Sequence, residues 1–135
     1  MSDLSHCLLY GATGYTGTLM AELAAAAGER PILAARSEGK LKPLAERLGL
    51  PWRAVGLDDP DALDAALHGI DVVLHAAGPF ARTSAPMVAA CLRTKTHYLD
   101  ITGEIPVFEA CFAQDGAAKA AGITVLPGVG FDVVP

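Results

Sequence analysis

The chain has 135 residues, of which 52% are hydrophobic and 19% charged, and its formal net charge is -5. This length suits one domain with a real core, and the high apolar fraction excludes an intrinsically disordered chain. The few basic residues argue against a sequence-independent nucleic-acid binder, and no run reaches the about 18 apolar residues of a membrane span.

Short apolar runs alternate with helix-like segments along the whole chain. The runs that predict strands are residues 6–10, 31–35, 52–55, 71–76, 97–100 and 123–126. The segments that predict helices are residues 15–27, 37–48, 59–68, 86–93 and 106–121. Six strands with helices between them predict a Rossmann-type, doubly wound parallel sheet, an α/β fold with helices on both faces.

Three local patterns add detail to these elements. Ser37 stands where a side chain can cap the second helix, and Asp59 followed by Pro60 is typical of a helix start. The run at 71–76 is β-branched and apolar, which predicts a strand buried on both faces.

A glycine-rich turn follows the first predicted strand. Glycines allow a sharp turn and let backbone N–H groups approach a pyrophosphate, and the helix N-terminus behind them adds positive partial charge. The third glycine lets the helix pack close to the strand. Placed between a strand and a helix, this turn predicts a phosphate-binding site, the alternative being a tight turn without a ligand. Its residues are Gly11, Ala12, Thr13, Gly14, Tyr15, Thr16 and Gly17.

The end of the second predicted strand selects between NAD(H) and NADP(H). NAD-selective sites usually place Asp or Glu there, to hold the ribose hydroxyls. This chain has Arg36 and Ser37 instead, with Lys40 nearby. A guanidinium attracts a 2′-phosphate, so NADP(H) is favoured over NAD(H). The alternative for Arg36 is a solvated charge at a helix start.

The remaining chemistry-bearing residues do not form a motif. Cys7, Cys91 and Cys111 stand in apolar runs without a CxxC spacing, which favours small buried side chains in a reducing compartment. The four histidines lack paired ligand spacing, so no metal site is expected. Residues 1–6 have neither the basic nor the apolar region of a secretory signal, and a cytoplasmic location is expected.

Three further segments make the pattern specific: Ala76-Ala77-Gly78-Pro79-Phe80, residues 97–104 (HYLDITGE) and residues 128–135 (GVGFDVVP). Together with residues 11–17 and 35–37, in this order, they closely resemble the saccharopine dehydrogenase-like family. The nearest branch is similar to the trans-acting enoyl reductases. The resemblance covers essentially the whole chain, but only the N-terminal portion of family members, which continue into a substrate-binding domain.

The resemblance implies an NADP-binding Rossmann domain over residues 1–127. Residues 128–135 would begin the crossover to a substrate domain that is absent from this chain. Residues 11–17 fall on the phosphate loop, and Arg36 and Ser37 fall on the adenosine-ribose end. The loop beside the nicotinamide ribose would contain Ala77, Gly78, Pro79 and Phe80; no catalytic residue is assigned.

One position departs from the pattern of similar proteins, and two carboxylates have more than one interpretation. Similar proteins often carry an Asp near the adenine where this chain has Gly56, and Asp58 could substitute for it from two residues later. Helix capping and loop solvation are nevertheless the favoured interpretation of Asp58 and Asp59. Asp100 and Glu104 follow the fifth predicted strand, at the edge where open α/β sheets bind ligands. They are candidates for acid–base or substrate groups, but ordinary helix capping is the favoured interpretation.

The family resemblance implies hydride transfer from NADPH to an imine or an activated alkene in a longer protein. The Tyr-x-x-x-Lys pair of short-chain dehydrogenases is absent from the sequence. We therefore expect the substrate-positioning groups outside these residues, and the chain alone to be inactive or nearly so. The alternative is a non-catalytic, NADP-sensing regulator. The expected partners are the dinucleotide, the missing substrate domain and, as an alternative, a second copy of the chain; nucleic acid and membrane are not expected.

Overall fold

The computed structural model describes residues 3–130, and the predicted α/β architecture is confirmed. The strands are β1 (Cys7–Tyr10), β2 (Ile32–Ala35), β3 (Trp52–Ala54), β4 (Val72–His75), β5 (His97–Asp100) and β6 (Val125–Leu126). The helices are α1 (Tyr15–Ala26), α2 (Glu38–Leu48), α3 (Pro60–Ala66), α4 (Phe80–Thr94), α5 (Ile105–Phe112) and α6 (Asp115–Ala121). Among these residues, no helix is long and apolar enough to cross a membrane.

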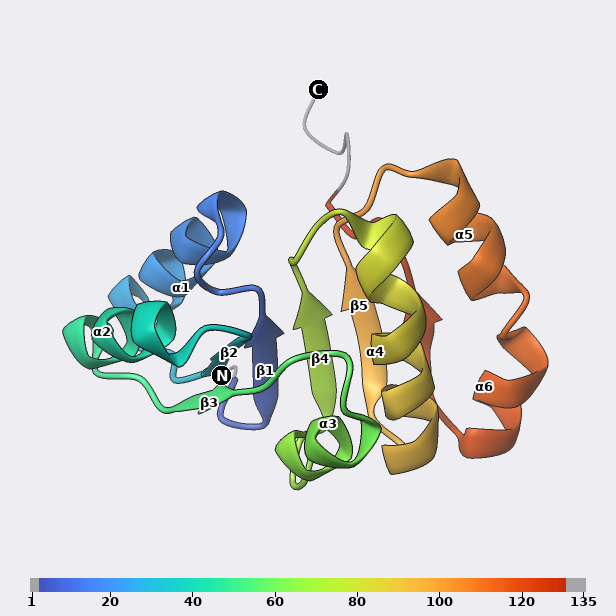
Figure 1. Ribbon diagram of the computed structural model, residues 1–135, viewed down its shortest axis with the longest axis horizontal. Coiled ribbons are helices and arrows are strands. Elements are labelled where there is room, and N and C mark those ends of the chain that lie inside the picture. Colours follow the sequence, from blue (N-terminus) through green and yellow to red (C-terminus); the bar gives the residue numbers. More distant parts are fainter. Residues whose placement is uncertain (1–2, 131–135) are drawn as a thin grey trace.

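The strands form one parallel sheet in the order β3-β2-β1-β4-β5-β6, which is the Rossmann order. From β1 the chain moves outward to β2 and β3, and it then crosses back to β4 and moves outward in the other direction. Right-handed crossovers place the helices of these two halves on opposite faces of the sheet. In Figure 1, α1 and α2 accordingly lie together beside β1, β2 and β3, while α4 lies in front of β5 and next to β4.

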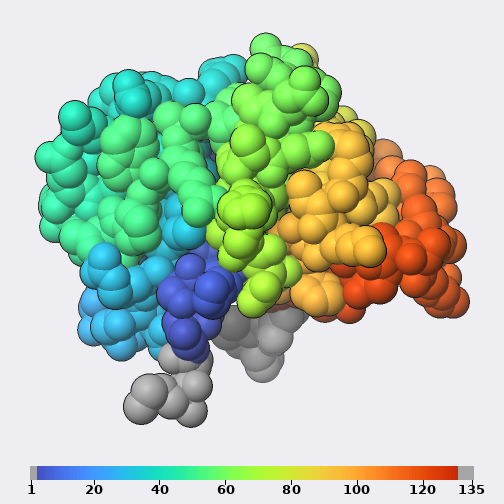
Figure 2. Space-filling view, turned by 90° about the horizontal axis from the view of Figure 1, so that it is seen from below, coloured from blue at the N-terminus to red at the C-terminus, as the bar shows by residue number. Residues whose placement is uncertain are grey.

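Two apolar clusters fill the spaces between the sheet and its helices. On one face, Leu9 and Leu33 pack with Ala21 of α1 and Leu41 of α2. On the other face, a larger cluster joins β1, β4 and β5 to α3, α4, α5 and α6. Figure 2 views the molecule from below Figure 1 and shows the middle of the chain, in green and yellow-green, between the N-terminal part in blue and the C-terminal part in orange and red.

The prediction that the fourth strand is buried on both faces is wrong. Val73 and His75 are fully buried, but Val72 and Leu74 are only half-buried. The reason is topological: α1 and α2 accompany the chain away from β4, so on their face the sheet is covered over β1, β2 and β3, and Leu74 of β4 is only partly covered. β5 shows the same alternation, with Tyr98 and Asp100 buried and Leu99 half-buried.

Two helix predictions also need correction. The segment expected as residues 86–93 is the longer α4, which begins at Phe80 and contains Pro86 in its interior. The segment expected as residues 106–121 is two helices, because Gln114, with φ -89° and ψ 6°, interrupts the helical path. Of the two expected caps, Asp59 accepts from the Ala62 N–H at 3.2 Å, whereas Ser37 stands at the cap position without a capping hydrogen bond.

Candidate dinucleotide-binding site

The expected site lies at the carboxyl edge of the sheet between β1 and β4. At this point the strand order switches from one side of β1 to the other. The segments that follow these two neighbouring strands leave toward opposite faces, which is the arrangement that opens a ligand crevice in α/β sheets. This edge is at the top of Figure 1, where α1 and α4 both begin. The glycine-rich turn and the 77–80 loop therefore come together, as their positions after β1 and β4 imply.

The glycine-rich turn is held by backbone contacts that only glycine allows. Gly11 has a φ of 88°, and a Cβ there would lie 2.6 Å from the Ala77 nitrogen, so the turn rests directly on the loop after β4. A Cβ on Gly17 would collide with the Gly11 carbonyl oxygen. The N–H groups of Gly11 and Ala12 both donate to the Ala34 carbonyl, at 2.9 and 3.2 Å, which anchors the turn to β2.

The N-terminus of α1, which begins directly after Gly14, carries no neutralising group. Its cap residue, Gly14, makes no side-chain capping hydrogen bond, and its first turn contains no acidic residue. Gly14, Tyr15 and Thr16 are exposed. An exposed helix start of this kind presents backbone N–H groups and positive partial charge to an anion.

The N-terminus of α4 is different, because a distant carboxylate already occupies it. The Glu104 side chain accepts from the Phe80 N–H at 2.9 Å and from the Ala81 N–H at 3.2 Å. Helix capping was the favoured interpretation of Glu104, and the structure shows which helix it caps. The side chain makes no capping bond with α5, the helix that follows it, and caps α4 instead.

Arg36 and Ser37 lie exposed at the carboxyl end of β2. Gly56 is next to this end: a Cβ on Gly56 would lie 2.9 Å from Asp58 Oδ1 and 3.8 Å from Arg36 Cγ. The Asp58 carboxylate thus occupies the space that a side chain at position 56 would fill. Tyr10 lies beneath, and its hydroxyl donates to the Val55 carbonyl at 2.8 Å. Desolvation raises the Tyr10 pKa, with Arg36 and Asp58 adding smaller opposing effects.

Asp100 is completely buried at the end of β5 and forms hydrogen bonds on all sides. Oδ2 accepts from the Tyr98 hydroxyl at 2.6 Å, while Oδ1 accepts from the N–H groups of Thr102 and Gly128 at 3.0 and 2.9 Å. Burial is the largest cause that raises the pKa of Tyr98 far above its ordinary range, and the hydrogen bond from its hydroxyl to Asp100 is the second. The Asp100 carboxylate therefore joins β5 to the segment after β6, which is a structural arrangement. Residues 131–135 of the predicted crossover lie outside the described residues.

Two residues near the 77–80 loop were not singled out from the sequence. Thr83 on α4 donates from Oγ1 to the Ala77 carbonyl at 2.6 Å. His75 Nε2 lies 2.9 Å from Thr83 Oγ1. His75 sits at the end of β4, and Phe80, expected in the loop, is the buried first residue of α4. The signal that could have found Thr83 is its position within the first turns of a helix that begins at Phe80.

His75 makes the stability of the domain depend on pH. Its ring faces Tyr10, Phe80 and Tyr98, and desolvation lowers its pKa from 6.5 to about 4 despite the nearby Asp100 charge. Because the unfolded chain binds this proton more tightly, stability present above pH 6.5 is lost as the pH falls toward 4. At about pH 4.5 the expected loss of unfolding free energy is roughly 2 to 3 kcal/mol.

Urea unfolding of the unmodified chain and of His75→Gln, each at pH 7 and at about pH 4.5, measures this loss. The carboxylates titrate in both proteins, so the difference between their pH dependences isolates His75. Equal pH dependence in the two proteins would contradict the assignment.

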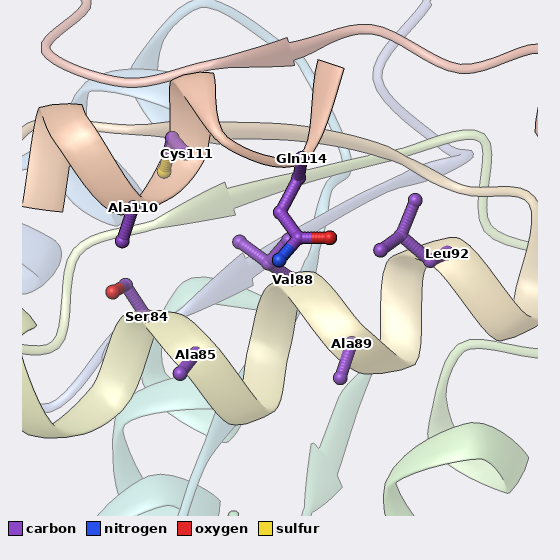
Figure 3. Close-up of a pocket in the computed structure, with 8 residues that line it drawn as sticks. All are labelled: Ser84, Ala85, Val88, Ala89, Leu92, Ala110, Cys111 and Gln114. Carbon is purple, nitrogen blue, oxygen red and sulfur yellow. The ribbon is translucent and has the colours of Figure 1, made fainter. Parts of the chain in front are cut away.

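A separate apolar pocket of about 110 Å³ lies between α4 and α5, away from this edge. In Figure 3, Ser84, Val88 and Leu92 line it from α4, Cys111 lines it from α5, and Gln114 extends over it. Desolvation raises the pKa of Cys111 to about 11, so its thiol is protonated at neutral pH. Cys91 and Cys111 are buried, as expected of small apolar side chains, and Cys7 is half-buried.

The sheet order, the helix arrangement and the reversal between β1 and β4 define a nucleotide-binding domain of the Rossmann class. Residues 7–126 match the model of the family described as saccharopine dehydrogenase NADP binding domain. The chain belongs to this family, and the prediction of the family from sequence motifs is confirmed. The family assignment also confirms NADP(H) as the expected cofactor.

Relatives and solved structures agree with this assignment. A trans-acting enoyl reductase from Mycobacterium leprae is 38% identical to 95% of this chain, which spans 32% of that protein. Apo saccharopine dehydrogenase (L-Glu forming) from Saccharomyces cerevisiae superposes with a TM-score of 0.79 and 25% identity, over 98% of this chain and 28% of that one. A triphenylmethane reductase from Citrobacter sp. complexed with NADP(H), at 21% identity, shares the fold with a TM-score of 0.69, over 90% of this chain and 48% of that one.

Proposed function

We propose that the carboxyl edge of the sheet binds NADP(H) along its length. The pyrophosphate would lie over residues 11–17, the 2′-phosphate against Arg36 and Ser37, and the nicotinamide ribose beside the 77–80 loop. The α1 N-terminus carries this proposal, because it is exposed, lies behind a turn that glycines keep narrow, and has no carboxylate in its first turn.

The adenosine end supports the same placement. Ser37 makes no capping hydrogen bond to α2, so its hydroxyl is available to a phosphate next to the Arg36 guanidinium. Asp58 lies at the position left open by Gly56, where a carboxylate can accept from the adenine amino group. These residues surround one end of β2 and β3, about where the adenosine half must lie if the pyrophosphate lies over α1.

The activity we propose for the longer protein is reduction of an imine or an activated alkene. Held by residues 11–17, Arg36 and Ser37, NADPH would supply a hydride to the electrophilic carbon, and a proton would be added to the neighbouring nitrogen or carbon. The support is the family and the enoyl reductase relatives, of which this chain spans about a third. The groups that orient the substrate would belong to a second domain following residues 128–135. An NADP-sensing regulator would bind NADPH equally but show no substrate-dependent oxidation of it.

Replacing Arg36 with alanine tests the cofactor placement. We expect the affinity for NADPH to fall 10- to 100-fold, since charge-assisted hydrogen bonds contribute about 1.5–3 kcal/mol. The affinity for NADH, which lacks the 2′-phosphate, should stay within about twofold of its original value. Fluorescence titration of both cofactors measures the two constants.

Arg30→Ala is the matched control. Arg30 is also exposed, but it precedes β2 and donates to the Gly49 carbonyl at 2.8 Å, at the opposite edge of the sheet. This variant removes the same charge and should leave the affinity for NADPH unchanged. Equal affinity of the unmodified chain for NADPH and NADH, or equal losses in the two variants, would count against the placement.

A further inference from the structure

The Thr83 hydroxyl connects the end of β4 to the loop that follows it. Its oxygen is 2.6 Å from the Ala77 carbonyl oxygen and 2.9 Å from His75 Nε2. A hydroxyl has one hydrogen, and two acceptors 2.6 Å apart would repel each other, so this hydrogen points to the Ala77 carbonyl. His75 Nε2 must then be the donor to Thr83, which fixes the tautomer of the ring.

The surroundings of the His75 ring fix its orientation, so that the Nε2 N–H points toward Thr83. The residue has no exposed surface, and the Tyr10, Phe80 and Tyr98 rings surround it at centroid distances of 5.7, 5.2 and 6.0 Å. Among residues 3–130, Nδ1 is the buried side-chain atom without a hydrogen-bond partner. A neutral ring with its hydrogen on Nε2 fits this environment, because a bare lone pair is less costly to bury than an unpaired N–H.

We propose that His75 and Thr83 are positioning residues that set the Ala77 carbonyl, and with it the loop that borders the nicotinamide half of the cofactor. The proposal rests on the proposed function, since it needs this loop to contact NADP(H). Neither side chain acts on a substrate. Their effect passes through the backbone of residues 77–79.

Two other contacts link the position of Ala77 to the backbone of the proposed site. The Gly11 turn rests on it so closely that a Cβ on Gly11 would be 2.6 Å from the Ala77 nitrogen and 2.8 Å from its Cα. At the other end of the loop, the Glu104 carboxylate fixes the Phe80 N–H at 2.9 Å. A shift of Ala77 would therefore move the backbone where the two halves of the proposed site meet.

Thr83→Val removes the hydroxyl while keeping the shape of the side chain. With the 135-residue chain, calorimetric titration would use NADPH and adenosine 2′,5′-bisphosphate, which lacks the nicotinamide half. We expect the affinity for NADPH to fall about tenfold, in line with a lost hydrogen bond that leaves the His75 N–H unpaired. The affinity for adenosine 2′,5′-bisphosphate should be unchanged, and Thr83→Ser should restore NADPH binding to within about threefold.

Thr94→Val is the matched control, because Thr94 also lies on α4 and donates to a backbone carbonyl, that of Ala90, at 2.8 Å. It is at the end of the helix away from the loop and should bind both ligands normally. If Thr83→Val folds poorly, a second pair of variants tests the same hydrogen bond. His75→Gln retains a donor and should bind NADPH better than His75→Met, which has no donor.

The outcomes separate the two proposals. If the unmodified chain binds neither ligand, the proposed function is wrong and this inference fails with it. If it binds both and Thr83→Val binds NADPH equally well, only the inference is overturned. Equal loss of both ligands in Thr83→Val, with its fold intact, would also overturn it, because the effect would not be specific to the nicotinamide half.

Discussion

Gly17→Ala is expected to abolish measurable NADPH binding and to lower the unfolding free energy by about 3 kcal/mol. The added Cβ would collide with the Gly11 carbonyl oxygen and lie 2.8 Å from the Gly11 carbonyl carbon and 3.0 Å from Ala12 Cα. All three are backbone atoms, and backbone cannot rotate away as a flexible side chain can. Urea unfolding and a cofactor titration on the same preparation measure the two effects.

Two alanine variants show whether this result is specific. A Cβ on Gly14 would meet only the Gly11 oxygen, at 3.5 Å, so Gly14→Ala should fold normally and lose affinity only if the pyrophosphate approaches there. Gly116 in α6 has open space around it, and Gly116→Ala should raise stability by up to about 1 kcal/mol. Unaltered stability of Gly17→Ala would contradict the close packing of the turn.

Asp100→Ala is expected to destabilise the domain by about 4 kcal/mol, because it leaves two buried donors and one part-buried donor without their acceptor. These are the Tyr98 hydroxyl at 2.6 Å and the N–H groups of Thr102 and Gly128 at 3.0 and 2.9 Å. Chemical denaturation at neutral pH measures the loss. Asp100→Asn keeps one acceptor oxygen, so its stability should lie between that of the unmodified chain and that of Asp100→Ala.

The control for Asp100 is Asp115→Ala, which removes an exposed carboxylate paired with Lys119 at 3.1 Å. Exposed i,i+4 pairs contribute little, so its stability should remain close to that of the unmodified chain. Similar losses in Asp100→Ala and Asp115→Ala would show that the buried hydrogen bonds contribute no more than a surface ion pair. The role we assign to Asp100 would then be wrong.

The sheet could be predicted because its signals are local. Most strands are short apolar runs, and Gly11 marks the turn after β1, where the φ of 88° is one that other residues avoid. The start of α4 could not be predicted in the same way. A proline within a helix usually lies in its first turn, so Pro86 suggested a helix start there. Burial of Met87, Val88 and Cys91 against the sheet outweighs the hydrogen bond that Pro86 cannot make.

The contacts of the candidate site were less accessible to sequence reasoning, because they join residues far apart in the chain. Glu104 accepts from N–H groups 24 and 23 residues earlier, and no periodicity reports such a pairing. The half-buried state of Leu74 has the same origin, since it depends on which face each crossover takes. By contrast, Arg36 and the glycine turn follow directly from their places at strand ends.

The helix starts at the carboxyl edge differ in charge, and this difference has a consequence for any elongated ligand. α1 begins without a carboxylate, whereas Glu104 already neutralises the start of α4. The edge therefore has a polarity. A molecule with phosphates at its centre and one end and an uncharged ring at the other is favoured in a single orientation, with the phosphates toward α1. A reversed molecule would bring its phosphates against the Glu104 carboxylate, so the domain would select the direction of binding as well as the ligand.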